Sequence, residues 1–281
     1  MAEQRACCVI GSPIDHSLSP ALHTAAYREL GLTWVYTRRE VPAGALAGFV
    51  DDVSRSGLEG LACGGLSITM PGKAEALARA DTRDERAVVL GAANTLVPRF
   101  GSDAVEGWTA YNTDVDGIVG AYAEHGLTDV TSRRCVIIGA GGTAAAAVAA
   151  LRSLGASEVG VLARNPDKAR ALVEVGAHLE CHVELLPWSS GERGAVRDAD
   201  VVASTVPPGV ADTIAASGLR GGQVVLDAVY AGGETALLRH ARADGAIAIG
   251  GVHMLLHQAI EQVRLMTGQR PSAQAMRAAL P

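Results

Sequence analysis

Short apolar runs recur through the second half of the chain, and most positions of each run are apolar. The runs are CVIIG (135–139), EVGVLA (158–163), DVVAST (200–205), QVVLDA (223–228) and AIAIG (246–250). Runs of this kind, without polar alternation, predict strands that are covered on both faces, as in a parallel sheet wrapped by helices. Helical or polar segments separate them, so the pattern predicts a doubly wound α/β domain.

The first half also alternates between apolar runs and helical segments, which predicts a second α/β domain. Strands are expected at ACCVIG (6–11), WVYTRREV (34–41) and GLSITM (65–70). Helices are expected from about Pro20, across GALAGFVDDV (44–53), from Gly72 and across DGIVGAYAEHG (116–126).

The last apolar segment, MLLHQAIEQVRLMTG (254–268), has helical spacing and no strand after it. We therefore expect it to return to the first domain. The polar stretch LTDVTSRR (127–134) leads into the second domain. The predicted division assigns residues 1–117 and 252–281 to the first domain and residues 118–251 to the second.

The size and charge of the chain restrict its partners. At 281 residues it exceeds the usual size of one hydrophobic core, which agrees with two domains. Its formal charge of -6 comes without a basic stripe, so we expect a small-molecule substrate and neither nucleic acid nor membrane as partner. No stretch approaches the roughly 20 apolar residues that span a bilayer, and the N-terminal apolar run is too short for a signal peptide. A cytoplasmic protein is expected.

The five cysteines are an odd number without CxxC spacing. This suits buried thiols in a reducing compartment better than disulfides or zinc. His253, His257 and Glu261 share one face of the last helix, but Met254 stands where a zincin helix carries its glutamate. We therefore predict no metal site.

The segment CVIIGAGGTAAAAVAAL has the order strand, glycine turn, helix. Gly139 permits a tight turn, Gly141 lets the backbone approach a pyrophosphate, and Ala144 is small enough to pack on the strand. The helix start offers free N–H groups to phosphate oxygens. A glycine pattern alone also fits a simple turn, but its position inside a βαβ repeat favours nucleotide binding. The predicted phosphate loop comprises Gly139, Ala140, Gly141, Gly142, Thr143 and Ala144.

The next strand ends in LARNPDKAR, with no acid at the strand end. An NAD site usually has Asp or Glu about twenty residues beyond the fingerprint, to bind the ribose 2′-hydroxyl. Here Arg164, with Lys168 one helical turn further on, can bind a 2′-phosphate through planar hydrogen bonds that a carboxylate would oppose. The sequence therefore favours NADP(H) over NAD, with Arg164, Asn165 and Lys168 in the cofactor site.

Several polar motifs occur in the first half: GSPIDHSLSPALH, GLSITMPGK, GAANTLV and YNTDVDG. In order and spacing they resemble the substrate domain of shikimate dehydrogenases, and DAVYAGGETALL and HMLLHQAIEQ resemble later motifs of that family. The resemblance extends from about Gly11 to Gly268. It implies an NADP-dependent oxidoreductase of aromatic amino acid biosynthesis that reduces 3-dehydroshikimate to shikimate. The first domain would bind the substrate, and the second would be a Rossmann-type NADP domain.

The resemblance implies that Lys73 and Asp114 form the catalytic pair. Hydride transfer to a ketone leaves negative charge on the oxygen, so a proton donor must lie within hydrogen-bond reach. Lys73 is the candidate donor, and the carboxylate of Asp114 would hold the ammonium in place. Taken alone, Lys73 would be read as a surface lysine and Asp114 as a helix cap.

Matching positions imply the remaining site residues. Ser17 and Ser19 would bind the substrate carboxylate from a rigid, proline-flanked loop, where short hydroxyl side chains lose little entropy on binding. Further substrate contacts would come from Ser67, Thr69, Asn94, Tyr230 and Gln258. Further cofactor contacts would come from Thr205, Ala228, Gly251 and Glu85, and Glu85 matches a position near the cofactor in only some members.

Three positions depart from the commoner family pattern. Ser67 stands where asparagine is usual, Gly72 replaces a bulkier residue, and Gly232 occupies a proline position. These changes bear on substrate affinity and discrimination more than on the reaction type. Two alternatives stay open, a quinate or quinate/shikimate dehydrogenase that uses NAD and a non-catalytic NADPH-binding regulator of the same fold. A monomer or homodimer is expected.

Overall fold

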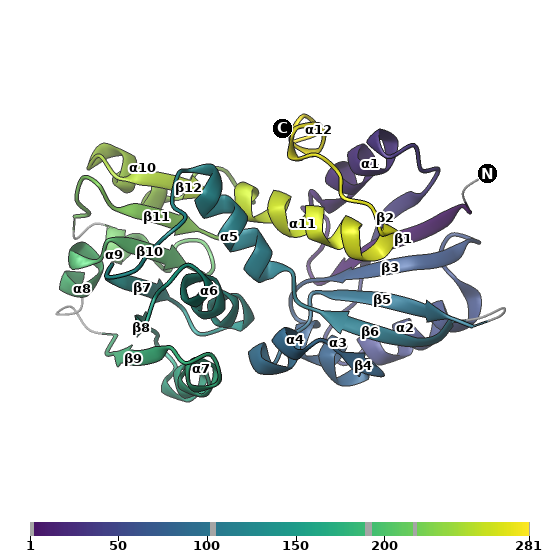
Figure 1. Cartoon of the computed structure of the whole chain (residues 1–281), viewed down its shortest axis with the longest axis horizontal. Coiled ribbons are helices and arrows are strands. Elements are labelled where there is room, and N and C mark those ends of the chain that lie inside the picture. The colour runs from purple at the N-terminus through teal and green to yellow at the C-terminus, as the bar shows by residue number, and fades with distance from the viewer. Residues whose placement is uncertain (1–2, 102–104, 189–192, 216–217, 281) are drawn as a thin grey trace. The chain divides into compact units, whose positions relative to one another are not determined.

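A computed structural model describes residues 3–101, 105–188, 193–215 and 218–280 of the chain (Figure 1). The chain divides into two compact units, unit 1 (Met1–Thr113 with Leu256–Pro281) and unit 2 (Asp114–Leu255). In the described ranges, each unit is built on one six-stranded sheet with helices packed against it. The predicted α/β fold class is confirmed, including the return of the C-terminal segment to the first unit.

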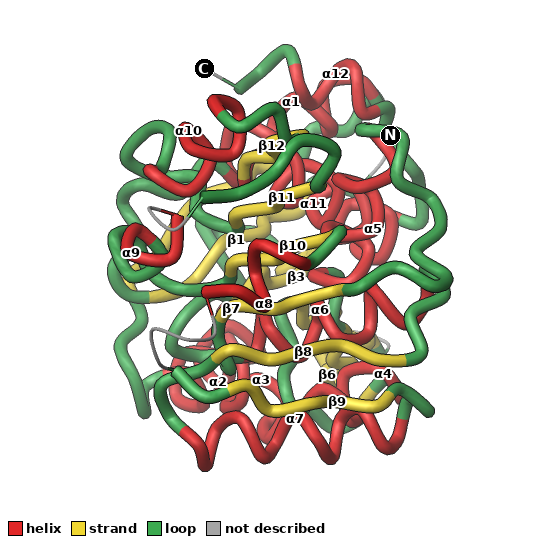
Figure 2. Tube along the Cα trace, turned by 90° about the vertical axis from the view of Figure 1, so that its left-hand side faces the viewer, coloured by secondary structure: helices red, strands yellow, loops and turns green. Residues whose placement is uncertain are grey.

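The described part of unit 2 has a parallel sheet of order β12-β11-β10-β7-β8-β9, which Figure 2 shows one strand above another. The chain starts in the middle at β7, runs outward to β9, and then runs outward in the other direction from β10. This doubly wound order is that of dinucleotide-binding folds. The strands are β7 (Cys135–Ile138), β8 (Glu158–Leu162), β9 (His182–Leu186), β10 (Val201–Ser204), β11 (Val224–Asp227) and β12 (Ile247–Gly250).

Both faces of the middle strand of this sheet are covered. Val136 and Ile138 of β7 pack in one core cluster with Leu237 and other buried residues, and Ile137, which points to the opposite face, is also fully buried. This double burial explains the uninterrupted apolar sequence. The helices are α5 (Asp114–Glu124), α6 (Gly142–Ser153), α7 (Pro166–His178), α8 (Arg193–Asp198), α9 (Asp212–Ala215) and α10 (Ala236–Ala243).

Strand β9 is absent from the strands that the sequence predicts. It lies at the edge of the sheet, and only Val183 among its residues is buried. An edge strand with an exposed face does not need the continuous apolar run that marks the inner strands. The search for such runs therefore misses it.

Unit 1 has a mixed sheet of order β2-β1-β3-β5-β6-β4 over its described residues. Strands β1 (Arg5–Gly11), β2 (Val35–Glu40) and β3 (Ala62–Ile68) are parallel and lie where the sequence predicts strands. The sequence does not predict β4 (Thr82–Arg83), β5 (Thr95–Phe100) or β6 (Val105–Tyr111). Strand β5 pairs antiparallel with both β3 and β6, and its proline and its exposed end hide it from a search for apolar runs.

Helix α2 (Leu46–Ser56) buries one apolar stripe in the core of unit 1. In α2, Leu46, Val50 and Val53 recur at helical spacing and pack with Ile10 and Trp108 in one core cluster. The helices are α1 (Ser19–Glu29), α2 (Leu46–Ser56), α3 (Lys73–Arg79), α4 (Glu85–Leu90) and α12 (Ala273–Arg277), together with α11 (Gly251–Thr267) from Leu256 onward.

All five cysteines are buried, free thiols, as predicted, and they are Cys7, Cys8, Cys63, Cys135 and Cys181. Burial raises the pKa of the Cys7 thiol to about 12, so that it stays protonated at neutral pH. The five cysteines act as small core residues.

Candidate active site

The glycine turn of unit 2 has the form that its sequence predicts. Gly139 has a φ of 119°, and a Cβ at this residue would lie 2.4 Å from Oγ1 of Thr205, so only glycine fits. The amide of Gly139 donates to the carbonyl of Leu162 at the end of β8. The turn thus lies at the carboxyl edge of the sheet, where ligands of doubly wound folds bind.

The beginning of α6 is open to a ligand. Gly141 is exposed, precedes the helix directly, and a Cβ there would meet no atom within 4 Å. Ala144 is fully buried against the unit 2 core, as its predicted packing role requires. The first N–H groups of the helix can therefore face a pyrophosphate without an intervening side chain.

The basic residues after β8 stand on the surface beside this turn, because β8 is the neighbour of β7. Arg164 and Lys168 are exposed, and the guanidinium of Arg164 lies 5.8 Å from the ring centroid of Trp188. The side chain of Asn165 caps α7 by accepting from the amides of Asp167 and Lys168, each at 3.0 Å. Trp188 is a neighbour that the sequence analysis does not identify.

The other predicted cofactor residues of unit 2 also follow strand ends. Oγ1 of Thr205 donates to the carbonyl of Ile138 at 3.0 Å, beside the glycine turn. A Cβ at Gly251 would lie 2.3 Å from the carbonyl oxygen of Ala228, so these two residues are in close backbone contact. Tyr230 follows Ala228 and is half-buried. Glu85 lies in unit 1, exposed at the first residue of α4.

The serine loop of unit 1 is held to neighbouring segments by hydrogen bonds. Ser17 and Ser19 are both buried, and Oγ of Ser17 accepts from the amide of Ser19 at 3.3 Å. The carboxylate of Glu40 accepts from the hydroxyl of Ser12 at 2.6 Å and from the amide of Ile14 at 3.3 Å. Glu40 fixes the loop and is missing from the sequence prediction.

The loops that follow β1 and β3 lie against each other. The amide of Thr69 donates to the carbonyl of Ile10 at 2.9 Å, and the amide of Ser12 donates to the carbonyl of Met70 at 3.0 Å. A Cβ at Gly11 would lie 2.4 Å from Cγ2 of Thr69, so glycine permits this close approach. The predicted carboxylate-binding serines and the segment that leads into Lys73 are thereby joined.

Ala93 and Asn94 connect the segment of Lys73 with the segment that ends at Thr113. The amide of Ala93 donates to the carbonyl of Lys73 at 3.0 Å. Oδ1 of Asn94 accepts from the amide of Thr113 at 2.8 Å, and its Nδ2 donates to Oγ1 of Thr113 at 3.0 Å. Asp114 follows directly as the buried first residue of α5. Oε1 of Gln258 lies 3.5 Å from Nδ2 of Asn94.

Four side chains next to these loops form a buried network that the sequence analysis does not identify as a unit. Oε1 of Gln262 accepts from Oγ of Ser67 at 2.9 Å and lies 3.2 Å from Nε2 of His23. The hydroxyl of Tyr36 donates to Oγ of Ser67 at 2.6 Å, and its ring stacks on His23 with centroids 3.9 Å apart. The only sequence signal for Gln262 is its spacing of four residues from Gln258, which places both on one helix face.

Burial lowers the pKa of His23 from 6.5 to about 3, and the hydrogen bond with Gln262 opposes this shift only in part. The unfolded chain therefore takes up a proton near pH 6.5 while the folded chain does not, so acid removes stability. We expect the free energy of unfolding, relative to that of His23→Phe, to fall by about 2 kcal/mol from about pH 7.5 to about pH 5. Denaturant titrations at several pH values measure it, and parallel curves for the two proteins would contradict it.

His253 and Glu261 of the last helix each contact a side chain of opposite type rather than each other. Nδ1 of His253 lies 3.1 Å from Oε2 of Glu124, and Glu261 binds Arg264 and Arg270. Within the described part of the chain, no group of three His, Cys, Asp or Glu residues is arranged to hold a metal ion.

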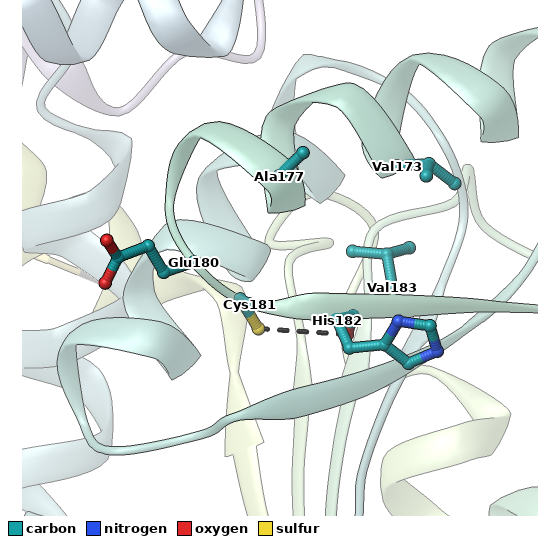
Figure 3. Close-up of a pocket in the computed structure, with 6 residues that line it drawn as sticks. All are labelled: Val173, Ala177, Glu180, Cys181, His182 and Val183. Atoms are coloured by element: carbon teal, nitrogen blue, oxygen red, sulfur yellow. Dashed lines mark hydrogen bonds between the residues drawn. The ribbon is translucent and has the colours of Figure 1, made fainter.

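One surface pocket of unit 2 is lined by none of the predicted site residues (Figure 3). It is lined by Val173, Ala177, Glu180, Cys181, His182 and Val183, between α7 and β9. Sγ of Cys181 lies 3.9 Å from the carbonyl oxygen of His182, and burial raises the pKa of this thiol.

An all-parallel doubly wound sheet, a GxGxxA turn and a basic strand end define a dinucleotide-binding oxidoreductase of the NADP type. Three family models match the chain: the shikimate dehydrogenase substrate binding domain at residues 9–96, shikimate / quinate 5-dehydrogenase at 121–207 and the shikimate 5′-dehydrogenase C-terminal domain at 251–280. The chain belongs to the shikimate dehydrogenase family.

Similar proteins match the chain over nearly its whole length. The shikimate dehydrogenase (NADP(+)) of Methanothermobacter thermautotrophicus is 36% identical over 278 residues, which cover 97% of this chain and 94% of that protein. The crystal structure of Mycobacterium tuberculosis shikimate dehydrogenase is 40% identical, with a TM-score of 0.85 and 98% of each chain covered. A quinate dehydrogenase from Corynebacterium glutamicum, solved in complex with NAD, is 32% identical, with a TM-score of 0.84 and 98% of each chain covered.

Proposed function

We propose that the protein catalyses the reversible NADP(H)-dependent reduction of 3-dehydroshikimate to shikimate, on the route to aromatic amino acids. The observation that carries this proposal is the set of hydrogen bonds that links the segments of Lys73, Asn94 and Thr113 in unit 1. These segments hold the lysine and precede the aspartate that match the catalytic pair of the family. The serine loop, joined to the same region, would receive the substrate carboxylate.

The residues of unit 2 fit NADP(H). The open backbone at Gly141 and the start of α6 suit the pyrophosphate, and the exposed guanidinium of Arg164 suits a 2′-phosphate. Asp167, the nearest acid in the sequence, forms an ion pair with Arg170. Ala228 and Gly251 present backbone and small side chains, which leaves room for a nicotinamide ring. Bound NADPH supplies the hydride.

The residues of the predicted substrate domain supply the proton and orient the ring. The ammonium of Lys73 donates a proton to the ketone oxygen as that oxygen gains negative charge, and the oxygen becomes the new hydroxyl. The carboxylate of Asp114 accepts a hydrogen bond from the hydroxyl and holds the ammonium near it. In the oxidation, Lys73 takes this proton back. Asn94 and Gln258 would hold the other ring hydroxyls and so fix the reacting carbon.

The direct test is an absorbance assay of NADPH oxidation on addition of 3-dehydroshikimate, repeated with NADH, and of the reverse reaction with shikimate and with quinate. We expect turnover of the shikimate pair with NADP(H), faster than with NAD(H) or with quinate. Faster turnover of quinate with NAD would instead favour the quinate alternative. NADPH binding without oxidation would favour the non-catalytic regulator.

Three further parts of the proposal concern organisation. Residues 1–117 with 252–281 would bind the substrate, and residues 118–251 would bind the cofactor. No helix among the described residues is long and apolar enough to cross a membrane, and we propose that the enzyme acts in the cytoplasm. A monomer or homodimer is expected, which sedimentation equilibrium distinguishes.

A further inference from the structure

The hydrogens of the buried network around Ser67 have fixed directions, and Gln262 sets them. Nε2 of Gln262 donates to the carbonyl of Asn94 at 3.1 Å and to Oγ1 of Thr95 at 3.1 Å. A backbone carbonyl can only accept, so the amide orientation is settled, and Oε1 faces Ser67 and His23. Thr95 agrees with this direction because its hydroxyl hydrogen goes to Oδ1 of Asn94 at 2.9 Å.

Because Oε1 of Gln262 faces Ser67, the only hydrogen of the Ser67 hydroxyl is used in the hydrogen bond to Gln262. Oε1 of Gln262 has no hydrogen, so the 2.9 Å contact requires that Ser67 donates. Tyr36 must then donate to Ser67 across their 2.6 Å contact. The hydroxyl oxygen has two lone pairs, and Tyr36 occupies one. Ser67 therefore retains one lone pair and no hydrogen for a ligand.

The network is too buried to rearrange at low cost. Tyr36, Ser67, Gln262 and His23 are between 0% and 6% exposed. Both lone pairs of Oε1 of Gln262 are engaged, by Ser67 and His23, so rotation of the amide would break four hydrogen bonds. A buried donor or acceptor that loses its partner is strongly disfavoured, which keeps the hydrogens in one arrangement.

We propose that Gln262 is a specificity-determining positioning residue that fixes Ser67 as a hydrogen-bond acceptor, so that Ser67 binds a donating ring hydroxyl of the substrate rather than its carboxylate. The proposal rests on the proposed function, in which Ser67 faces the substrate. An asparagine at this position would offer both donor and acceptor, whereas Ser67 offers an acceptor alone. A carboxylate or keto oxygen has no hydrogen to donate. It would be repelled by the remaining lone pair on Oγ of Ser67.

The test compares shikimate with two analogues in which one or the other non-reacting ring hydroxyl is replaced by fluorine, which cannot donate. The measured quantity is the ratio of kcat/KM for shikimate to kcat/KM for each analogue. For the wild type we expect roughly a tenfold ratio or more against one of the two analogues. Gln262→Met leaves the Ser67 hydrogen free to turn to the ligand, so the same ratio is expected to fall several-fold.

Two controls separate this role from a structural one. Tyr36→Phe removes the donor to Ser67 but leaves the Ser67 hydrogen on Gln262, so the ratio is expected to persist. Ser54→Ala removes a hydroxyl that binds Nε1 of Trp108 elsewhere in unit 1, and it is expected to leave the ratio unchanged. An equal loss of kcat/KM for all three substrates in Gln262→Met would overturn the proposal.

If Gln262→Met does not fold, Ser67→Ala replaces it, because it removes the acceptor with a smaller change of volume. It is expected to abolish the discrimination against the same analogue, and an unchanged ratio overturns the proposal. Wild-type turnover of shikimate is measured first. If it is absent, the proposed function fails and this inference with it, whereas turnover with no discrimination against either analogue overturns only the inference.

Discussion

Lys73→Ala is expected to lower kcat for 3-dehydroshikimate reduction by roughly a thousandfold, since positioned proton transfer contributes about a hundredfold to ten-thousandfold. NADPH binding should persist, because Lys73 lies in unit 1 and the predicted phosphate loop lies in unit 2. Steady-state rates and the fluorescence of bound NADPH measure the two quantities. A rate near that of the wild type would remove Lys73 from the role of proton donor.

The chain supplies an unusually direct control for this variant. Lys73 and Lys168 are its only two lysines, and its other 22 basic residues are arginines. We expect Lys168→Ala to raise KM for NADPH with little change of kcat, because Lys168 is assigned to the 2′-phosphate and not to the reacting oxygen. A comparable loss of kcat in both variants would indicate a general effect of removing positive charge.

Arg164→Ala is expected to raise KM for NADPH by roughly ten- to a hundredfold and to leave KM for NADH nearly unchanged. The reason is the loss of charge-assisted hydrogen bonds to a 2′-phosphate, which contribute about 1.5 to 3 kcal/mol and which NADH cannot form. Steady-state kinetics with both cofactors measure the change in preference.

Arg170→Ala is the matched control for Arg164, because Arg170 is an exposed arginine of α7 that pairs with Asp167. We expect it to leave both KM values unchanged. If Arg164→Ala weakened both cofactors equally, Arg164 would contact a part that they share, and the basis for preferring NADP in this chain would be lost. This experiment is informative because the chain is also similar to a quinate dehydrogenase that was solved in complex with NAD.

The sequence predicts inner strands well because they are buried on both faces, and all five apolar runs of the second half are strands. It misses β9, where only Val183 is buried, and it misses β5 and β6, whose antiparallel pairing depends on contacts across the sheet. Where a strand is buried by partners distant in sequence, its own sequence shows no regular alternation of apolar and polar residues. Tertiary contacts, and not local pattern, define these strands.

The candidate site shows the same limit. The glycine turn and the basic strand end can be read locally, because their chemistry depends on adjacent residues. The network of Tyr36, Ser67, Gln262 and His23 draws one residue from each of β2, β3, α11 and α1, so no spacing in the sequence reveals it. The spacing of Gln258 and Gln262 indicates only a shared helix face. The hydrogens of this network have fixed directions because the amide of Gln262 donates to the backbone carbonyl of Asn94. Only the folded structure brings these two groups together.

The loop after β8 lets cofactor preference and protein stability change independently. Arg164 in this loop and Lys168 in the first turn of α7 are exposed and contribute no side chain to the core of unit 2. Exposed substitutions of this kind usually change the free energy of unfolding by no more than about 0.5 kcal/mol. An engineer who wants an NADH-driven variant can therefore change Arg164 and Lys168, while keeping Asn165 as the cap of α7, without first building a stabilised parent.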